Sequence, residues 1–231
     1  MPMTRLRSRS LLRAFAAASL FALASTLAGA HDFVDLRSIP PLHGDASAGK
    51  EKAAVCSACH GAAGISPAAA FPNLAGQHAE YLYWQLVEFQ REARPESPMT
   101  SQVKDLDDAT LRNLAAWFAL QPPAPFNANA TPATDRGARL FREGDPATGT
   151  PPCQGCHGAD AGGFPLAADN SSYRTYPILR GQHADYVVQR LRDFRDGKHA
   201  SSTSDRIMTP VAKTLDDEAI HAVALFIEAG R

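Results

Sequence analysis

The sequence predicts an all-α protein made of two tandem helical domains. Two observations predict this: a set of short motifs occurs twice along the chain, and apolar residues recur at helical spacing in both halves. Neither half contains a convincing run of alternating apolar and polar residues, which a half-buried strand would show. We expect a leader at residues 1–30, an N-terminal domain at 31–121, a linker at 122–134 and a C-terminal domain at 135–231.

The leader has the features of a secretory signal peptide. Four arginines near its start are followed by an apolar stretch over residues 11–27, and Ala28-Gly29-Ala30 supplies small residues for an export peptidase. A membrane anchor is the alternative, but Arg13 interrupts the apolar run and leaves it short of the ~20 residues that a spanning helix needs. We expect export to the periplasm with no transmembrane anchor, and peripheral association with a membrane stays open.

The charge of the chain excludes one class of function. The formal net charge is −1, and loss of a leader with four arginines and no acidic residue makes the mature chain more acidic. A nucleic-acid-binding protein needs a basic face, so we expect no nucleic-acid partner. An acidic protein is instead steered toward a basic docking patch on a partner protein.

The internal repeat covers most of the mature chain. A Cys-x-x-Cys-His motif, a Gly-Gln-His segment, a Met-Thr pair and a Leu-Asp-Asp triplet occur once per half in the same order. Their positions are 56–60 and 153–157, 76–78 and 181–183, 99–100 and 208–209, and 106–108 and 215–217. The spacing between the copies grows along the chain, so the second copy carries loop insertions, which we place around residues 161–174 and 198–205.

Each half contains a first, a middle and a last predicted helix. The first begins after Asp45 as N-cap and runs over residues 46–57, and its counterpart starts near Asp135. A middle helix follows each Gly-Gln-His segment, and the last helix is capped by Asp107 or Asp216. The apolar stripes of the middle helices are Leu82, Leu86 and Phe89, and Val187, Leu191 and Phe194. Since each half has only about 95 residues, a large apolar cofactor would add much to its core.

The Cys-x-x-Cys-His motifs predict two covalently attached haem c groups, one per half. The cysteines of each motif are spaced to add across the two vinyl groups of one haem, and the adjacent histidine can ligate the iron from the same turn. The cysteines are Cys56, Cys59, Cys153 and Cys156, and the histidines are His60 and His157. Two copies at matching places, with no other cysteine in the chain, make the prediction specific.

Three other uses of the cysteines are alternatives to haem attachment. A thioredoxin-like dithiol would follow a strand in a sheet-containing fold, and neither half shows that pattern. A structural zinc site needs four ligands, which would require more ligands per half or all four cysteines together. Two disulfides would suit an exported protein but would leave the histidines that follow the cysteines unexplained.

Methionine content addresses the second axial position of each iron. Once the leader is removed, Met99 and Met208 are the two methionines left, one per half at equivalent positions. Both lie close to proline, so we expect each in a fixed loop, with its thioether as an iron ligand. Filling a core is the common alternative use of methionine, but it does not predict one methionine per motif. The rival ligands are His78 and His183, which we interpret as structural or surface residues.

The predicted ligand set determines the chemistry. Ligation by His and Met fills both axial positions and raises the reduction potential. An iron without an open position cannot bind peroxide or oxygen, yet it can pass an electron through the exposed haem edge. The sequence therefore predicts an electron carrier and no enzyme.

At this point the chain resembles a known family. Two class I cytochrome c domains in tandem, each with Cys-x-x-Cys-His, Pro-x-Leu-x-Gly-Gln, a middle helix, a methionine, Leu-Asp-Asp and a final helix, resemble cytochrome c4. The resemblance runs from about Asp45 to Ala229. It implies a periplasmic two-haem carrier that passes electrons from a quinol-oxidising complex toward a terminal oxidase or another redox enzyme.

The resemblance also implies roles for individual residues. The carbonyls of Pro72 and Pro177 would accept the Nδ1 proton of the ligand histidines, a bond that fixes the ring. Gly49 and Gly137 would let the last helix of each half cross the first closely, with Trp117 and Phe226 as the matching aromatic residues. Two segments depart from the family pattern: an N-terminal extension over residues 31–44 and about nine extra residues at 144–152.

Two alternative functions stay open. The chain could be the electron-accepting cytochrome subunit of a periplasmic dehydrogenase, with the same haems and a permanent partner. A di-haem peroxidase is the second alternative, but it would need one iron with an open or displaceable position, which two equivalent methionines disfavour.

Overall fold

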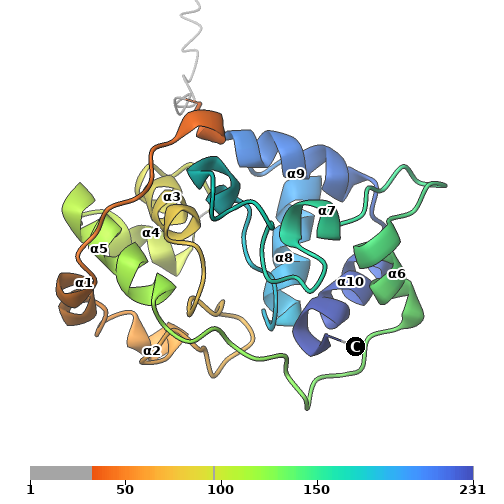
Figure 1. Ribbon diagram of the computed structural model, residues 1–231, viewed down its shortest axis with the longest axis horizontal. Helices are drawn as coiled ribbons and strands as arrows, with labels where there is room; N and C mark the ends of the chain where they lie inside the picture. The colour runs from red at the N-terminus through yellow and green to blue at the C-terminus, as the bar shows by residue number, and fades with distance from the viewer. Residues whose placement is uncertain (1–32, 96, 231) are drawn as a thin grey trace, which may run out of the picture. The chain divides into compact units, whose positions relative to one another are not determined.

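The computed structural model describes residues 33–95 and 97–230, so the predicted leader lies outside the described residues. The helices of the first copy are α1 (Ala46–Lys52), α2 (Ser57–His60), α3 (Ala79–Gln90), α4 (Pro98–Val103) and α5 (Asp108–Ala119) (Figure 1). Those of the second are α6 (Asp135–Glu143), α7 (Gln154–His157), α8 (Ala184–Arg195), α9 (Thr203–Lys213) and α10 (Asp217–Ala229). Two short 3-10 helices are η1 (Leu36–Ser38) and η2 (Ser171–Thr175).

The predicted all-α class is confirmed. In the described residues the only extended pairing consists of two isolated bridges, Val34 with Ser202 and Asp145 with Thr150. No helix in this part of the chain is long and apolar enough to cross a membrane.

The predicted N-caps are confirmed for three helices. The carboxylates of Asp45, Asp107 and Asp216 accept hydrogen bonds from backbone N–H groups in the first turns of α1, α5 and α10. These bonds satisfy donors that have no partner inside the helix, so each aspartate fixes where its helix begins.

In each half the first helix packs closely on the last. A Cβ atom at Gly49 of α1 would lie 2.0 Å from the carbonyl oxygen of Asn113 in α5. In the second half a Cβ atom at Gly137 of α6 would lie 2.1 Å from the carbonyl oxygen of Ala222 in α10. Since any other side chain would force the helices apart, the crossing implied by the family resemblance is confirmed.

Two hydrophobic cores lie behind these crossings, one in each half. The core of the first half is built from residues of α3, α4 and α5, and that of the second from residues of α6, α8 and α10. Their most deeply buried large residues are Leu111 in the first half and Phe141 and Ile220 in the second. Phe226 packs on Phe141 with ring centroids 5.0 Å apart.

The first predicted helix is shorter than expected. It ends at Lys52 instead of residue 57, and after a turn the short helix α2 begins at Ser57. The Cys-x-x-Cys-His motif therefore has a helical turn of its own.

The prediction that both methionines lie in loops is wrong. Met99 is the second residue of α4, which begins at Pro98. Proline is tolerated there because its missing N–H would have no partner inside the helix. Met208 lies within α9, which also contains Pro210.

The second insertion that the sequence places in a loop is partly helical. It was expected around residues 198–205, but α9 already begins at Thr203. Ser202 and Asp205 form a reciprocal capping box there. This pairing satisfies backbone N–H groups where α9 begins, which the polar composition of the segment did not indicate.

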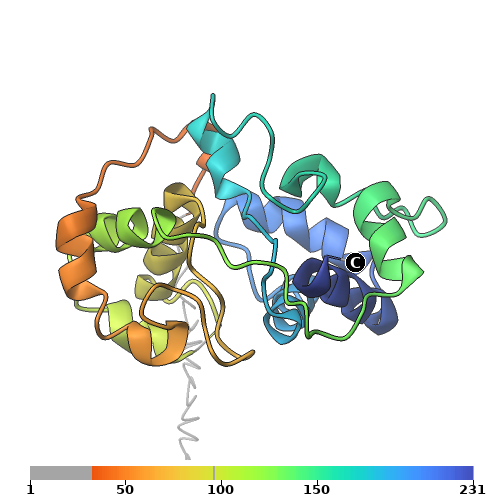
Figure 2. The same ribbon diagram turned by 60° about the horizontal axis from the view of Figure 1, so that its bottom comes forward.

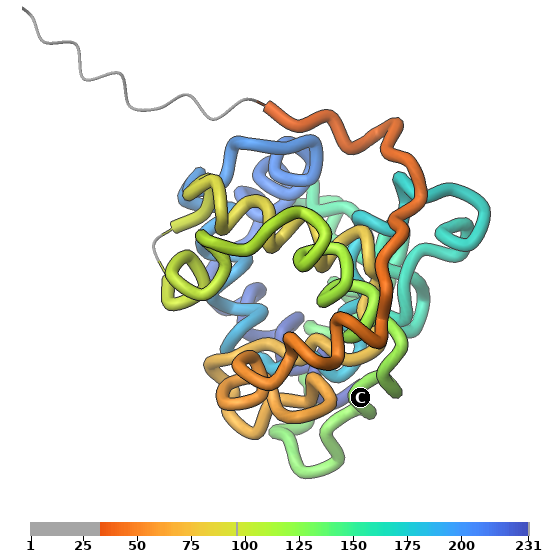
Figure 3. Tube along the Cα trace, turned by 90° about the vertical axis from the view of Figure 1, so that its left-hand side faces the viewer, coloured from red at the N-terminus to blue at the C-terminus, as the bar shows by residue number. Residues whose placement is uncertain are grey.

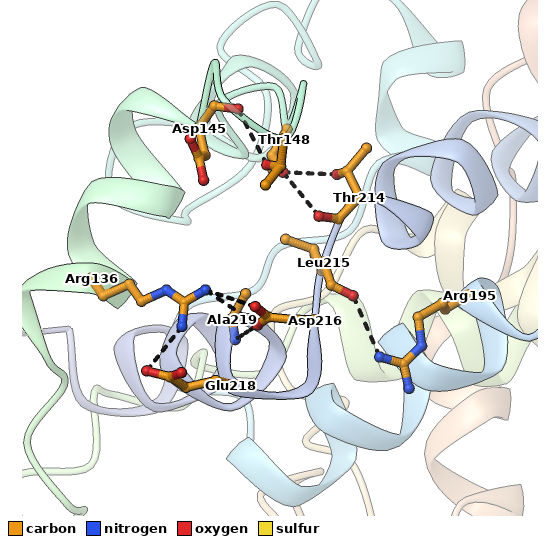
Figure 4. Close-up of polar contacts among 10 residues, drawn as sticks. Arg136, Asp145, Thr148, Arg195, Thr214, Leu215, Asp216, Glu218 and Ala219 are labelled. Carbon is orange, nitrogen blue, oxygen red and sulfur yellow. Dashed lines mark hydrogen bonds and ion pairs between the residues drawn. The ribbon is translucent and has the colours of Figure 1, made fainter.

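The extra residues 144–152 are anchored to the end of α9. Asp145 and Thr150 exchange backbone hydrogen bonds of 2.8 and 2.9 Å. The hydroxyl of Thr150 donates to that of Thr214 over 2.8 Å, and nearby Arg136 of α6 pairs with two carboxylates at the start of α10 (Figure 4). The insertion is thus a turn held on its own half.

Residues 122–134 connect α5 to α6 without a helix (Figure 2). Ala124 is buried, and the backbone N–H of Asn127 donates to the carbonyl of Glu228 over 2.8 Å. The ring of Phe126 lies so near Gly230 that a Cβ atom there would be 2.6 Å from it. The segment is extended, as its Pro-rich composition predicts, and it packs on the end of α10.

Residues 33–44, which we call the N-terminal strap, contact both copies of the repeat (Figures 1 and 3). The N–H of Val34 donates to the carbonyl of Ser201 over 2.8 Å, and the N–H of Leu36 donates to the hydroxyl of Thr203 over 3.1 Å. Farther along, the N–H of Leu42 donates to the carboxylate of Glu80 in α3 over 3.2 Å. The strap therefore joins the start of α9 to the first half.

We predict that Leu36→Ala lowers the free energy of unfolding by about 2–3 kcal/mol, because it empties a site in which Leu36 is 4 % exposed. Urea unfolding of the holoprotein, followed by circular dichroism, measures this. The control is Arg37→Ala, since within the described residues Arg37 pairs only with its exposed neighbour Asp35 and should change stability by less than about 0.5 kcal/mol. A loss for Leu36→Ala no larger than that for Arg37→Ala would contradict the stabilising role of the Leu36 side chain.

Candidate haem sites

The first Cys-x-x-Cys-His motif forms one helical turn. Cys56 is the N-cap of α2, and the N–H of His60 donates to its carbonyl over 3.0 Å. The turn ends at Gly61, whose φ of 76° favours glycine and where a Cβ atom would lie 2.0 Å from the carbonyl oxygen of Ile65. The glycine thus lets the chain reverse sharply behind the histidine.

The second motif repeats this geometry. Cys153 is the N-cap of α7, and the N–H of His157 donates to its carbonyl over 3.0 Å. Gly158 ends the turn with a φ of 82°, and a Cβ atom there would lie 2.2 Å from the carbonyl oxygen of Gly163. In both halves one turn therefore carries two thiols and an imidazole, which is what attachment and ligation of one haem require.

Both candidate ligand histidines are buried and held by the predicted carbonyl groups. His60 Nδ1 lies 2.9 Å from the carbonyl oxygen of Pro72, and His157 Nδ1 lies 2.8 Å from that of Pro177. Because a carbonyl only accepts, each Nδ1 carries the proton and each Nε2 presents its lone pair. Burial lowers the pKa of both imidazoles, which also favours the neutral form that binds a metal.

No disulfide joins the four cysteines, all of which lie in the described part of the chain. Burial raises the pKa of Cys56, and it raises that of Cys153 to about 11, so these groups stay protonated at neutral pH. A redox-active dithiol needs a lowered thiol pKa, which is the opposite shift. Residues 33–95 and 97–230 also contain no group of three or more His, Cys, Asp or Glu side chains that could hold a metal ion, as a zinc site would require.

The two candidate methionines lie on helices next to the cores. Met99 of α4 packs against the same hydrophobic cluster as Cys56, which brings the candidate ligand and the candidate attachment residue to one core. Met208 is partly buried on α9, a helix that packs on α8. The hydroxyl of the adjacent Thr209 is buried and has no hydrogen-bond partner among the described residues. The indole N–H of Trp117 is likewise buried and without a partner there. A bound group with acceptor atoms fits such sites.

His78 and His183 do not lie in the two Cys-x-x-Cys-His turns. Each is the N-cap residue of a middle helix, α3 or α8. His183 Nε2 lies 3.1 Å from the carbonyl oxygen of Ser66, and its Nδ1 lies 3.5 Å from a carboxylate oxygen of Glu228. Because both ring nitrogens of His183 have protein partners, the interpretation of this residue as structural agrees with its contacts.

The sequence prediction missed a pair of glutamines that joins the two sites. Gln77 receives the N–H of Ile178 over 2.9 Å and donates to its carbonyl over 2.8 Å. Gln182 makes the same two contacts with Asn73, over 2.8 and 3.0 Å. Asn73 and Ile178 directly follow the prolines whose carbonyls hold the histidines. The signal was present in the duplicated Gly-Gln-His segment, but periodicity alone does not show that the two copies pair.

Comparison with known proteins agrees with these features. Residues 134–230 match the family model of cytochrome c, and residues 44–118 match that of subunit III of cbb3-type cytochrome c oxidase. Cytochrome c4 of Pseudomonas aeruginosa is 40% identical over 80% of this chain and 88% of its own length. The thiosulfate dehydrogenase electron acceptor of Thiomonas intermedia is 36% identical, covering 79% of this chain and 82% of its own.

A solved structure supports the same relationship. The crystal structure of reduced recombinant cytochrome c4 from Pseudomonas stutzeri matches with a TM-score of 0.70 and 36% identity, covering 81% of this chain and 99% of that one. The strap lies almost entirely outside the segments that the two family models match.

We predict that Gln77→Ala and Gln182→Ala each lower the free energy of unfolding by about 1–3 kcal/mol, because each leaves a backbone N–H and a carbonyl without their partner. Urea unfolding of the holoprotein measures the change. Gln189→Ala is the matched control, since Gln189 is exposed and bonds to Asp193 within its own helix. A loss no larger than that of the control would mean that the cross-repeat contacts do not stabilise the fold.

Proposed function

This chain belongs to the cytochrome c4 family and is a di-haem electron-transfer protein with two covalently bound haem c groups, and from that premise we propose which residues hold the haems and how they work. One haem belongs to the N-terminal domain at residues 31–121 and the other to the C-terminal domain at 135–231. The bound haem supplies an iron that gains or loses a single electron.

The cysteines provide the covalent attachment. Each pair of thiols would hold its haem through thioether bonds to the two vinyl groups. Cys56 and Cys59 hold the first haem, and Cys153 and Cys156 hold the second.

The histidines and methionines provide the axial ligands. His60 and His157 present Nε2 to the iron, and the observation that carries this proposal is the bond from each Nδ1 to a proline carbonyl, made identically in both halves. Met99 and Met208 would supply the second ligand of each iron through their thioethers. A thioether favours the reduced iron, so both haems have moderately high reduction potentials.

With His and Met as its two ligands, each haem iron would have no open position for a substrate, so the chain would transfer electrons only. The electron enters and leaves through the haem edge, which needs no open coordination position. The ligand histidines move no proton, because each Nδ1 proton is held by its carbonyl.

Export by the leader at residues 1–30 places the chain in the periplasm. There it would receive electrons from a quinol-oxidising complex and deliver them to a terminal oxidase or another redox enzyme. A second candidate function is that of the electron-accepting partner of a periplasmic dehydrogenase, favoured by the similarity to the electron acceptor of thiosulfate dehydrogenase. Size-exclusion chromatography of native extract separates the two, since a permanent partner would co-elute with this chain.

We predict that the wild-type protein, reduced at neutral pH, does not bind carbon monoxide rapidly, because no axial position is open. Met99→Ala and Met208→Ala should each remove about half of the weak long-wavelength sulfur-to-iron absorption and let one equivalent of carbon monoxide bind. Absorption spectra of the oxidised and reduced proteins during a carbon monoxide titration measure both effects.

The outcomes distinguish the proposals. A variant that keeps the full sulfur-to-iron band would show that the substituted methionine is no ligand. Rapid stoichiometric carbon monoxide binding by one haem of the wild-type protein would contradict the carrier function and favour a peroxidase.

A further inference from the structure

Each copy of the repeat has a partly or fully buried arginine near its middle helix, but at a different repeat position. In register with the two Gly-Gln-His segments, Gln85 corresponds to Arg190, and Arg94 corresponds to His199. The first half therefore carries its cation after the middle helix, and the second half carries it within the middle helix.

In the first half the cation comes from Arg94. Its Nη1 donates to Oε1 of Gln85 over 2.8 Å, and its guanidinium lies over the ring of Phe89 at 3.9 Å from the centroid. Burial and the neighbouring Arg190 lower the pKa of Arg94, so the two cations lie near enough to repel each other. An anion between or beside them would remove that repulsion.

In the second half the positions equivalent to Gln85 and Arg94 also contact each other, but here the arginine is at the first position and His199 is at the second. Arg190 lies over the ring of Phe194, the equivalent of Phe89, at 4.8 Å from its centroid, and its Nη1 is 2.6 Å from Nε2 of His199. A guanidinium has no lone pair to accept a hydrogen bond, so Arg190 donates and His199 Nε2 accepts. The proton of His199 is therefore on Nδ1. Burial together with nearby Arg190 and Arg94 lowers the pKa of His199 to about 2, which keeps the ring neutral.

Two of the buried donors without a partner belong to equivalent positions of the repeat. They are Nε of Arg94 and Nδ1 of His199, which have no hydrogen-bond partner among the described residues. A buried donor without a partner costs about 1–3 kcal/mol, so one such atom could be a local defect. The same vacancy at the same repeat position in both halves, on two different residue types, indicates an acceptor that each half binds.

The neighbouring protein carboxylates do not serve as that acceptor. Oδ2 of Asp205 already receives hydrogen bonds from the backbone and hydroxyl groups of Ser201 and Ser202. Glu88 receives the amide of Gln85 over 3.0 Å, and burial with nearby Asp205 raises its pKa to about 7, so it is only partly ionised at neutral pH. The two arginines thus lack full anionic compensation from the protein.

We propose that Arg94 and His199 are equivalent positioning residues, each donating a hydrogen bond to a carboxylate of the haem in its own half, with Arg190 supplying the charge behind His199. This inference rests on the haem sites proposed above, because a haem in each half would bring carboxylates to both halves. A carboxylate of the first haem then meets a cation directly, whereas that of the second meets a neutral ring with the cation one residue behind it.

This difference would give the two haems different reduction potentials. A positive charge close to a haem favours the reduced iron, so the directly placed cation of Arg94 raises the potential of the first haem more than the His199–Arg190 pair raises that of the second. The two copies of the duplicated unit would then differ in midpoint potential because their arginines occupy different repeat positions.

The test is a redox titration of purified two-haem variants, resolved into its two steps. Arg94→Gln should shift one step to lower potential by clearly more than it shifts the other. His199→Leu should shift the other step, and His199→Gln, which keeps an N–H donor, should restore much of that shift. The control is Lys104→Gln, which removes an exposed charge from the same half as Arg94 and should move neither step appreciably.

A double variant guards against misfolding of the single ones. Gln85→Arg with Arg94→His gives the first half the residues that the second half already uses, so the cation is kept and only its position changes. We expect this variant to retain two haems and to bring the two midpoint potentials closer together.

Two-haem variants whose steps move no more than those of Lys104→Gln, or in which one substitution shifts both steps equally, would overturn the inference. A count below two haems per chain in the wild-type protein would instead contradict the proposed haem sites themselves.

Discussion

The hydrogen bond from each candidate ligand histidine to a proline carbonyl holds the imidazole ring in one orientation. It fixes the tautomer, so that Nε2 is the only ring atom free to bind a metal, and it fixes the plane of the ring. The bond can form only if the Pro-containing segment lies directly beside the Cys-x-x-Cys-His turn. Much of the fold serves to hold that segment in place.

Contacts between the two copies of the repeat give the segment its rigidity. Gln77 and Gln182 each bind the backbone of the residue that follows the opposite proline, so the segment that orients one histidine is held by the other half. The strap over residues 33–44 adds a second connection, from the start of α9 to Glu80 of α3. A change in one half can therefore alter the geometry of the candidate ligands in the other.

The fold could be predicted from the sequence where local chemistry decides it. Asp45, Asp107 and Asp216 mark helix starts because a short carboxylate satisfies free N–H groups wherever a helix begins. The close crossings at Gly49 and Gly137 were implied by the family resemblance, and the structure explains them because glycine lacks a Cβ atom. The loops expected at both methionines were wrong for a local reason, since Pro98 begins a helix and a capping box starts α9. The role of the strap and the pairing of the glutamines depend on contacts between residues far apart in sequence.

The central claim of this account is that each Cys-x-x-Cys-His turn carries its own covalently bound haem. A pyridine haemochrome assay of the purified mature protein, combined with its intact mass, measures this directly. We predict two covalent haems per chain and a mass equal to that of the exported polypeptide plus two haems. A value of one haem or none, or a haem that is extracted by acidic acetone, would contradict the account.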